Sequence, residues 1–173
     1  MPRLAVSELY WIRGHRLAVA ARPAGEPELA EDLRQLRSAG VDILVSALPP
    51  DEAAGLGLAD QARLAGDAGL EFVSIPIPDA GTPEPAAVGD ALDLLARAVQ
   101  DGRSVAIHCR AGVGRSPMLV AAILALGGRE PDAAWQLVVA ARGYPVPDND
   151  EQRRWVTAFM ATRAESLRGR AAP

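Results

Sequence analysis

The chain has 173 residues, 49% hydrophobic and 23% charged, so it fits a single globular domain and excludes a disordered or fibrous protein. Its net charge of −4 at pH 7 excludes a generally basic surface, so we expect no binding to nucleic acid or to an anionic membrane. Any anion-binding site must be local, and we expect one domain over residues 1–165 followed by a flexible tail at 166–173.

The first part of the chain predicts a hairpin, a helix and a buried strand. Short strands are expected at 9–12 and 16–23, separated by a glycine and ended by a proline. A helix follows over 28–38, because its leucines recur at helical spacing. The β-branched run at 41–48 then predicts a buried strand.

The middle of the chain repeats this alternation of helix and strand. A helix is expected at 58–69, a strand at 70–77 and a second helix at 86–100. The segment 76–85 carries four prolines and one glycine, which exclude regular structure there. We therefore expect a loop between the strand and the second helix.

The last part adds one more buried strand, SVAIHC at 104–109, the loop RAGVGR, and helices at 116–126, 131–142 and 149–164. Strands that alternate with helices predict an α/β fold, in which a central, mostly parallel, twisted sheet is flanked by helices. The RAGVGR loop at 110–115 would connect a central strand to the helix that follows it.

The stretch HCRAGVGRSP at 108–117 has the features of an anion site. It contains the only cysteine of the chain, Cys109, then two glycines, and then a helix that begins at Ser116. Glycines permit the backbone angles by which loop N–H groups converge on one point, and the helix N-terminus adds partial positive charge. Pro117 fits the first helical turn, where no N–H donor is needed.

The same stretch supplies a nucleophile and a cation. The converging donors would stabilise Cys109 as a thiolate. Arg115 can donate two parallel hydrogen bonds to a phosphate from the opposite rim, a geometry that lysine cannot reproduce. The sequence therefore predicts a phosphate receptor with a nucleophile at its floor.

The pattern His108-Cys109-x5-Arg115-Ser116 resembles the signature of the cysteine-based protein tyrosine phosphatases, in particular their small dual-specificity branch, and the order of elements over residues 9–160 is similar to that fold. The resemblance implies that Cys109 attacks phosphorus, that Ser116 eases breakdown of the thiophosphate intermediate, and that His108 orients the loop and helps to keep the thiolate. It also implies that the phosphate oxygens are bound by the Arg115 side chain and by the backbone of Arg110, Ala111, Gly112, Val113, Gly114 and Arg115.

Expulsion of an alkoxide or phenoxide requires a proton donor, which typically contributes about 10²- to 10⁴-fold in rate. Asp79, in IPIPDAGTP, lies thirty positions before Cys109, between a strand and a helix, and resembles the general-acid aspartate of the family. No tryptophan precedes the Pro-Asp pair, as it does in the large tyrosine-specific members. The alternative is that this Asp only favours a turn.

The segment PVPDNDEQRRW at 145–155 lies where related enzymes place polar groups that position the hydrolytic water. Gln152 and Asn149 are therefore candidates for that role. The alternative is that Asp148 or Asn149 caps the last helix and that Gln152 lies on its exposed face.

Other phosphatase families and other functions would leave different marks in the sequence. Low-molecular-weight phosphatases place the Cys-x5-Arg loop near the N-terminus, and rhodanese-like phosphatases lack an upstream loop aspartate. A binding module without turnover would be marked by a missing Cys, Arg or acid, and all three are present. An inositol phosphate or lipid phosphatase would be expected to have lysines in the loop, where Ala111 and Val113 stand and only Arg110 adds charge.

We therefore expect a phosphomonoester hydrolase, either a protein tyrosine phosphatase or a dual-specificity phosphatase. Its substrate would be a phosphorylated protein, with phosphotyrosine preferred, or a small phosphomonoester, and the loops at 22–28 and 49–57 would set the depth of the pocket. No metal and no other cofactor is expected, because Arg115 and the loop N–H groups supply the positive field that phosphoryl transfer needs.

The sequence also gives expectations about location and assembly. One cysteine cannot form an intramolecular disulfide, and the start MPRLAVSELYWIRG lacks the apolar core of a secretory signal. The longest apolar stretch, MLVAAILALGG from Met118, is about half of the ~20 residues that a membrane helix requires. We therefore expect a cytoplasmic monomer.

Overall fold

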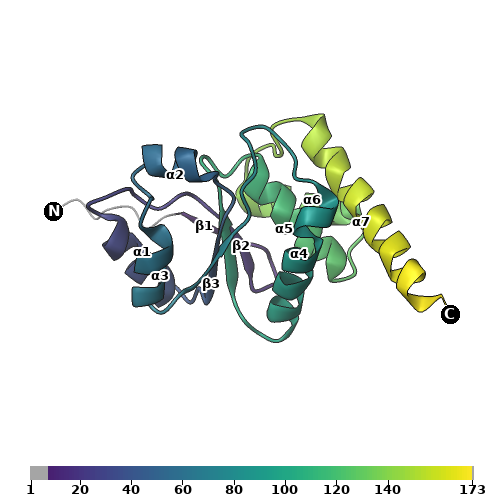
Figure 1. Ribbon diagram of the computed structural model, residues 1–173, viewed down its shortest axis with the longest axis horizontal. Helices are drawn as coiled ribbons and strands as arrows, with labels where there is room; N and C mark the ends of the chain where they lie inside the picture. Colours follow the sequence, from purple (N-terminus) through teal and green to yellow (C-terminus); the bar gives the residue numbers. More distant parts are fainter. Residues whose placement is uncertain (1–7, 173) are drawn as a thin grey trace.

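The computed structural model describes residues 8–172 and contains a five-stranded sheet with the order β1-β2-β5-β3-β4 (Figure 1). The strands are β1 (Leu9–Trp11), β2 (Leu17–Ala20), β3 (Ile43–Ser46), β4 (Glu71–Ser74) and β5 (Val105–His108). Strands β2, β5, β3 and β4 are parallel, and β1 pairs antiparallel with β2 as the predicted hairpin. The predicted fold class is confirmed.

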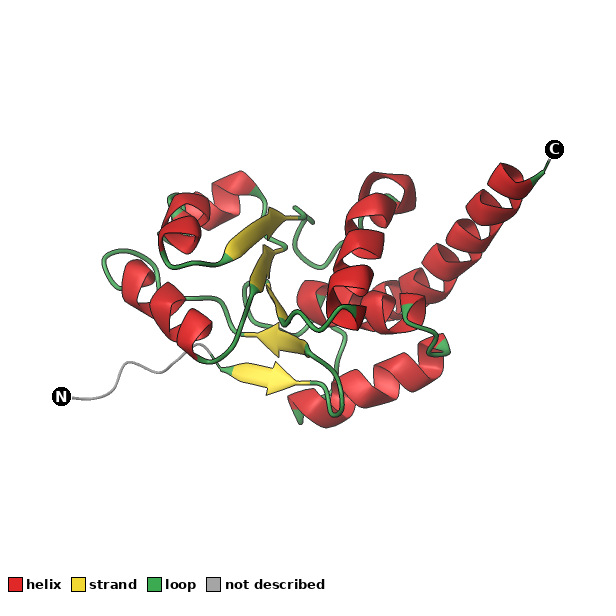
Figure 2. Ribbon diagram, turned by 90° about the horizontal axis from the view of Figure 1, so that it is seen from below, coloured by secondary structure: helices red, strands yellow, loops and turns green. Residues whose placement is uncertain are grey.

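Helices cover both faces of the sheet, as Figure 2 shows with the strands in yellow and the helices in red. They are α1 (Leu29–Ser38), α2 (Pro50–Gly55), α3 (Gln61–Asp67), α4 (Pro85–Gln100), α5 (Arg115–Leu126), α6 (Pro131–Arg142) and α7 (Asp150–Ala171). Helices α1 and α3 pack together on one side, and α4, α5, α6 and α7 lie on the other (Figures 1 and 2). This arrangement follows from parallel crossovers, which place helices on the faces of a sheet.

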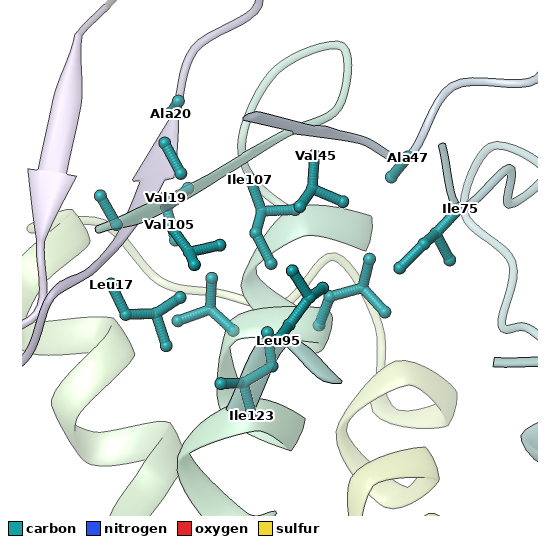
Figure 3. Packing of buried hydrophobic residues seen from close by; sticks show 14 of the residues in the cluster. Leu17, Val19, Ala20, Val45, Ala47, Ile75, Leu95, Val105, Ile107 and Ile123 are labelled. Carbon is teal, nitrogen blue, oxygen red and sulfur yellow. The ribbon is translucent and has the colours of Figure 1, made fainter. Parts of the chain in front are cut away.

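The core is centred on β5, the middle strand, and on α5, which follows it. Every residue of β2, β3 and β5 is buried, and so are the first eleven residues of α5. In Figure 3, Val105 and Ile107 of β5 point toward Leu95 of α4 and Ile123 of α5. Full burial of one such side chain contributes roughly 1.5–3 kcal/mol, so the strand and helix that flank the loop at 109–114 are firmly anchored.

Two helices differ from the sequence-based expectation. Residues 49–57 were expected as a loop, but 50–55 form α2, because Pro50 fits the first helical position and Asp51 and Glu52 place negative charge in the first turn. The predicted end of the last helix at 164 is wrong, since α7 runs to Ala171 through strong helix formers such as Ala, Glu, Leu and Arg. Those last turns are exposed, and their flexibility stays a prediction.

The carboxyl ends of the parallel strands meet at one edge of the sheet. From this edge β3 leads to α2, β4 leads to the loop that carries Asp79, and β5 leads to the loop that carries Cys109. Ligands of open α/β sheets bind outside the carboxyl ends of the strands. The candidate residues therefore lie where this architecture places a site.

Candidate active site

The phosphate loop, defined here as residues 109–114, joins β5 to α5 and makes a tight turn at the sheet edge. Gly112 has φ +69°, a left-handed conformation that residues with a Cβ rarely adopt. A Cβ on Gly114 would lie 2.2 Å from Oδ2 of Asp148 and 2.9 Å from the Gln152 amide, so a larger residue there would require these side chains to move. The backbone therefore requires glycine at Gly112, and Gly114 lies in close contact with the start of the last helix.

Cys109 lies at the base of a small cavity and is 3% exposed. Its Sγ is 3.2 Å from Oγ of Ser116 in the first turn of α5, within hydrogen-bonding distance for a sulfur. The cavity has a volume of about 220 Å³ and is lined by Asp79, Cys109, Arg110, Ala111, Val113, Gly114, Arg115 and Asp148. The structure thus brings Asp79, Cys109 and Arg115 together from two loops that are far apart in the sequence.

Arg115 is almost fully buried and is fixed by three elements. Its Nη1 and Nη2 donate to the two carboxylate oxygens of Glu52 at 2.7 and 2.9 Å, and Nη1 also donates to the Ile77 carbonyl at 3.0 Å. Nη2 lies 3.2 Å from Oδ1 of Asp79. The hydrogen bond from Arg115 lowers the pKa of Glu52, and the same bond raises the pKa of Arg115, so both groups are charged.

Glu52 was missed by the sequence reasoning. It stands in α2, a helix that the sequence did not reveal, and no motif links it to Arg115. The sequence did offer one indication: Glu52 is among the first acidic residues after β3, and the carboxyl end of a buried parallel strand is where a site is expected. Among the described residues it is the carboxylate that binds Arg115 through both of its oxygens.

His108, the last residue of β5, is buried and neutral. Burial lowers its pKa to about 4. Its Nδ1 lies 3.1 Å from the Cys109 carbonyl, which can only accept, so Nδ1 carries the proton and Nε2 accepts from the Gln61 amide at 2.7 Å. The ring therefore ties α3 to the start of the phosphate loop, a position that suits the orienting role that the resemblance implied.

Asp79 lies in the acid loop, defined here as residues 78–84, between β4 and α4. Its side chain is 72% exposed and lines the same cavity as Cys109. The next residue, Ala80, has φ 57°, and its N–H donates to Oδ1 of Asp79 at 3.0 Å. The acid loop therefore brings the Asp79 carboxylate beside Arg115 and into the lining of the cavity.

The start of α7 contributes the two polar residues that the sequence singled out. Asn149 caps the helix, since its Oδ1 accepts from the Gln152 N–H at 2.9 Å, as the alternative reading expected. Gln152 is fully buried, so its expected place on the exposed face of the helix is wrong. Its Nε2 donates to the Gly81 carbonyl at 3.2 Å, and its Oε1 has no hydrogen-bond partner among the described residues.

Arg142, at the end of α6, supports the phosphate loop from outside. Its Nε donates to the Gly112 carbonyl at 2.9 Å and its Nη2 to the Ala111 carbonyl at 3.4 Å. The guanidinium also lies over the Tyr10 ring, 4.3 Å from its centroid. These bonds restrain two consecutive residues of the phosphate loop. Sequence reasoning missed this residue, because it is more than twenty positions from the loop.

Within residues 8–172, no three His, Cys, Asp or Glu side chains are placed to hold a metal ion together. Within the same range, the helices are too short or too polar to cross a bilayer.

The chain is similar to known phosphatases. Residues 18–129 match the family model described as "Polymorphic toxin system, DSP-PTPase phosphatase". Protein tyrosine phosphatase domain-containing protein 1 of Danio rerio is 30% identical over 136 residues, which cover 72% of this chain and 19% of that protein. The chain thus spans about a fifth of the length of this relative.

Solved structures share the fold. The active form of Tk-PTP has a TM-score of 0.70 and 27% identity, and the alignment covers 87% of this chain and 95% of that one. Kinase associated phosphatase, with its catalytic-site cysteine substituted by serine, has a TM-score of 0.77 and 22% identity, with coverages of 86% and 87%. The comparison with kinase associated phosphatase concerns the fold alone.

Proposed function

Because the chain belongs to the DSP-PTPase phosphatase family, we propose that it hydrolyses phosphomonoesters through a thiophosphate intermediate on Cys109. The observation that carries this proposal is the cavity in which Cys109, Arg115 and Asp79 meet. A nucleophile, a cation and a carboxylic acid around one small anion-sized space are the three parts that phosphoryl transfer to a thiolate needs.

In the first step the Cys109 thiolate attacks phosphorus, so that an S–P bond forms and the P–O bond to the leaving group breaks. The phosphate loop N–H groups and the free edge of Arg115 bind the equatorial oxygens. Asp79 donates its proton to the departing oxygen, which leaves as an alcohol or phenol. This assignment is supported by the position of Asp79 beside Arg115.

In the second step a water molecule attacks phosphorus, gives its proton to Asp79, and displaces the thiolate as the S–P bond breaks. The Ser116 hydroxyl, 3.2 Å from Sγ, can donate a hydrogen bond to the sulfur as charge returns to it. The buried Oε1 of Gln152, which has no partner in the described part of the chain, favours a role in orienting this water. Asn149 is a weaker candidate, because its amide is used in capping and in a contact to Ala80.

The charges around the cavity favour a single phosphate as the substrate group. Arg110 and Arg115 are faced by the carboxylates of Glu52, Asp79 and Asp148. Among the described residues that line the cavity, the arginines do not outnumber the carboxylates, so they offer no surplus positive charge for a second phosphate, as a polyphosphorylated inositol would require. A phosphorylated protein, with phosphotyrosine preferred, or a small phosphomonoester fits this balance.

The proposal is tested by hydrolysis of p-nitrophenyl phosphate in EDTA across pH. Wild type is expected to be active without metal, Cys109→Ser to be inactive, and Asp79→Asn to be slower and to lose the alkaline limb of the rate profile. The exposed residue change Glu165→Gln serves as the control and should behave as wild type. A wild type that binds vanadate without turnover would contradict the proposal and identify a binding module instead.

A further inference from the structure

Three side chains at the start of α7, those of its N-cap Asn149 and of Gln152 and Trp155 in its first turns, donate hydrogen bonds to the acid loop. Asn149 Nδ2 donates to the Ala80 carbonyl at 3.0 Å, Gln152 Nε2 to the Gly81 carbonyl at 3.2 Å, and Trp155 Nε1 to the Pro83 carbonyl at 2.8 Å. The three donors are spaced by three residues, which places them in a row along the helix. The loop carbonyls are nearly consecutive, so the row follows the loop from Asp79 toward α4.

These bonds hold the tip of the acid loop. Among the described residues, the hydrogen bonds that reach 80–83 from another element all come from α7. The loop also borders a cavity of about 410 Å³, lined in part by Pro78, Thr82 and Pro83 and by the first turns of α4. Packing on that side is therefore incomplete, and the α7 side supplies the restraint.

The loop conformation itself requires such a restraint. Ala80 adopts φ 57°, a left-handed conformation that an L-residue with a Cβ occupies at a cost. The carbonyl of this residue is the one that Asn149 binds. Release of the α7 contacts would let Ala80 return to an ordinary conformation and carry Asp79 away from Arg115.

We propose that Asn149, Gln152 and Trp155 form a latch that keeps the acid loop over the phosphate loop and so sets the fraction of molecules in which Asp79 can donate its proton. This inference rests on the proposed role of Asp79 as the general acid. The latch residues act through Asp79 and are positioning residues. For Gln152 this is a second task beside the orientation of water.

Trp155→Phe tests the latch with little change in packing. The indole N–H is removed, while a ring stays in place to stack on Phe159, whose centroid is 4.8 Å away. Loss of one neutral hydrogen bond corresponds to roughly a three- to tenfold effect. We expect kcat/KM for phenyl phosphate, a poor leaving group, to fall by that factor, and kcat/KM for 2,4-dinitrophenyl phosphate, which leaves without protonation, to stay within about twofold.

A matched control and a second variant accompany this change. Trp135→Phe removes the other buried indole N–H, which donates to the Arg153 carbonyl and does not touch the acid loop, and it should leave both substrates as in wild type. Asn149→Asp keeps the capping oxygen but cannot donate to the Ala80 carbonyl, and it should repeat the leaving-group pattern of Trp155→Phe. Thermal melting identifies any variant that has lost its fold, and the other variant then decides.

The double variant Asp79→Asn/Trp155→Phe separates positioning from a general structural effect. If the latch acts only through Asp79, the tryptophan change has no further effect once the acid is gone. An equal loss on both substrates, no loss on either, or full additivity with Asp79→Asn would overturn the latch. Failure of the proposed function is distinct, because it would appear as a wild type without Cys109-dependent activity.

Discussion

The guanidinium of Arg115 is fixed in place before any phosphate arrives. Glu52 and the Ile77 carbonyl accept hydrogen bonds from three of its five N–H groups, and the remaining two are one on Nη2, which lies near Asp79, and the Nε–H, which the described residues leave for an anion. A preorganised donor costs no reorganisation at the moment of reaction. A buried cation without its carboxylate partner would also be costly, so Glu52 contributes to both binding and stability.

At this scale we predict that Glu52→Gln lowers kcat/KM for p-nitrophenyl phosphate roughly 10- to 100-fold. The reason is the loss of a charge-assisted hydrogen bond to Arg115, worth about 1.5–3 kcal/mol, which lets the guanidinium leave the orientation that phosphate requires. Steady-state kinetics and the affinity for vanadate measure the effect, with Glu165→Gln as the matched control. A variant with wild-type affinity for vanadate would show that Arg115 needs no such support.

The site residues that the sequence predicted and those that it missed differ in how far apart they lie along the chain. Cys109, Arg115 and Ser116 lie within one loop and one helical turn, so their spacing in the sequence reports their spacing in the site. Glu52, Gln61 and Arg142 act across elements whose relative placement only the folded sheet defines. For Asp79, the position between a strand and a helix supplied the link that spacing alone could not.

At the scale of elements, the site consists of two loops that are held from behind by helices. Helix α6 binds carbonyls of the phosphate loop through Arg142, and α7 binds carbonyls of the acid loop. The alternation of helix and strand predicted most of these elements, because each carries an apolar stripe or a β-branched run. It missed α2, since six residues with a proline and no buried side chain show no periodicity.

We predict that Arg142→Lys raises KM for p-nitrophenyl phosphate roughly three- to tenfold, with a smaller change in kcat. A lysine ammonium lacks the two fixed, separate nitrogens with which Arg142 contacts the Gly112 and Ala111 carbonyls, so the phosphate loop becomes less ordered in the free enzyme. Inhibition by inorganic phosphate should weaken by the same factor. Arg168→Lys, in the exposed end of α7, is the control, and an unchanged KM in Arg142→Lys would exclude the supporting role.

At the scale of the whole molecule, the buried neutral His108 links the active site to acid stability. Its pKa in the folded state is about 4, below the ordinary value of 6.5 that it regains on unfolding. The neutral ring therefore stabilises the fold fully above about pH 6.5. As the pH falls from there toward 4, the unfolded state takes up the proton first and stability is lost.

We accordingly predict that the free energy of unfolding falls by about 3 kcal/mol more between pH 7 and pH 4 in wild type than in His108→Gln. Glutamine is a polar side chain of similar length that does not titrate. Urea unfolding at several pH values gives both curves, and the difference between them isolates this residue from the carboxylates that also titrate. Parallel curves would show that the imidazole becomes charged without cost inside the fold.

The order of strands has a consequence for how the protein comes to be active. Strand β5 is the last to be made and the middle one in the sheet, and it inserts between β2 and β3. A growing chain that has emerged only as far as α4 therefore contains the pair β1-β2 and the pair β3-β4, but it lacks the strand that joins the two pairs. The segment that fills this gap carries the reactive sulfur at its end, so the nucleophile enters its pocket in the same event that completes the core.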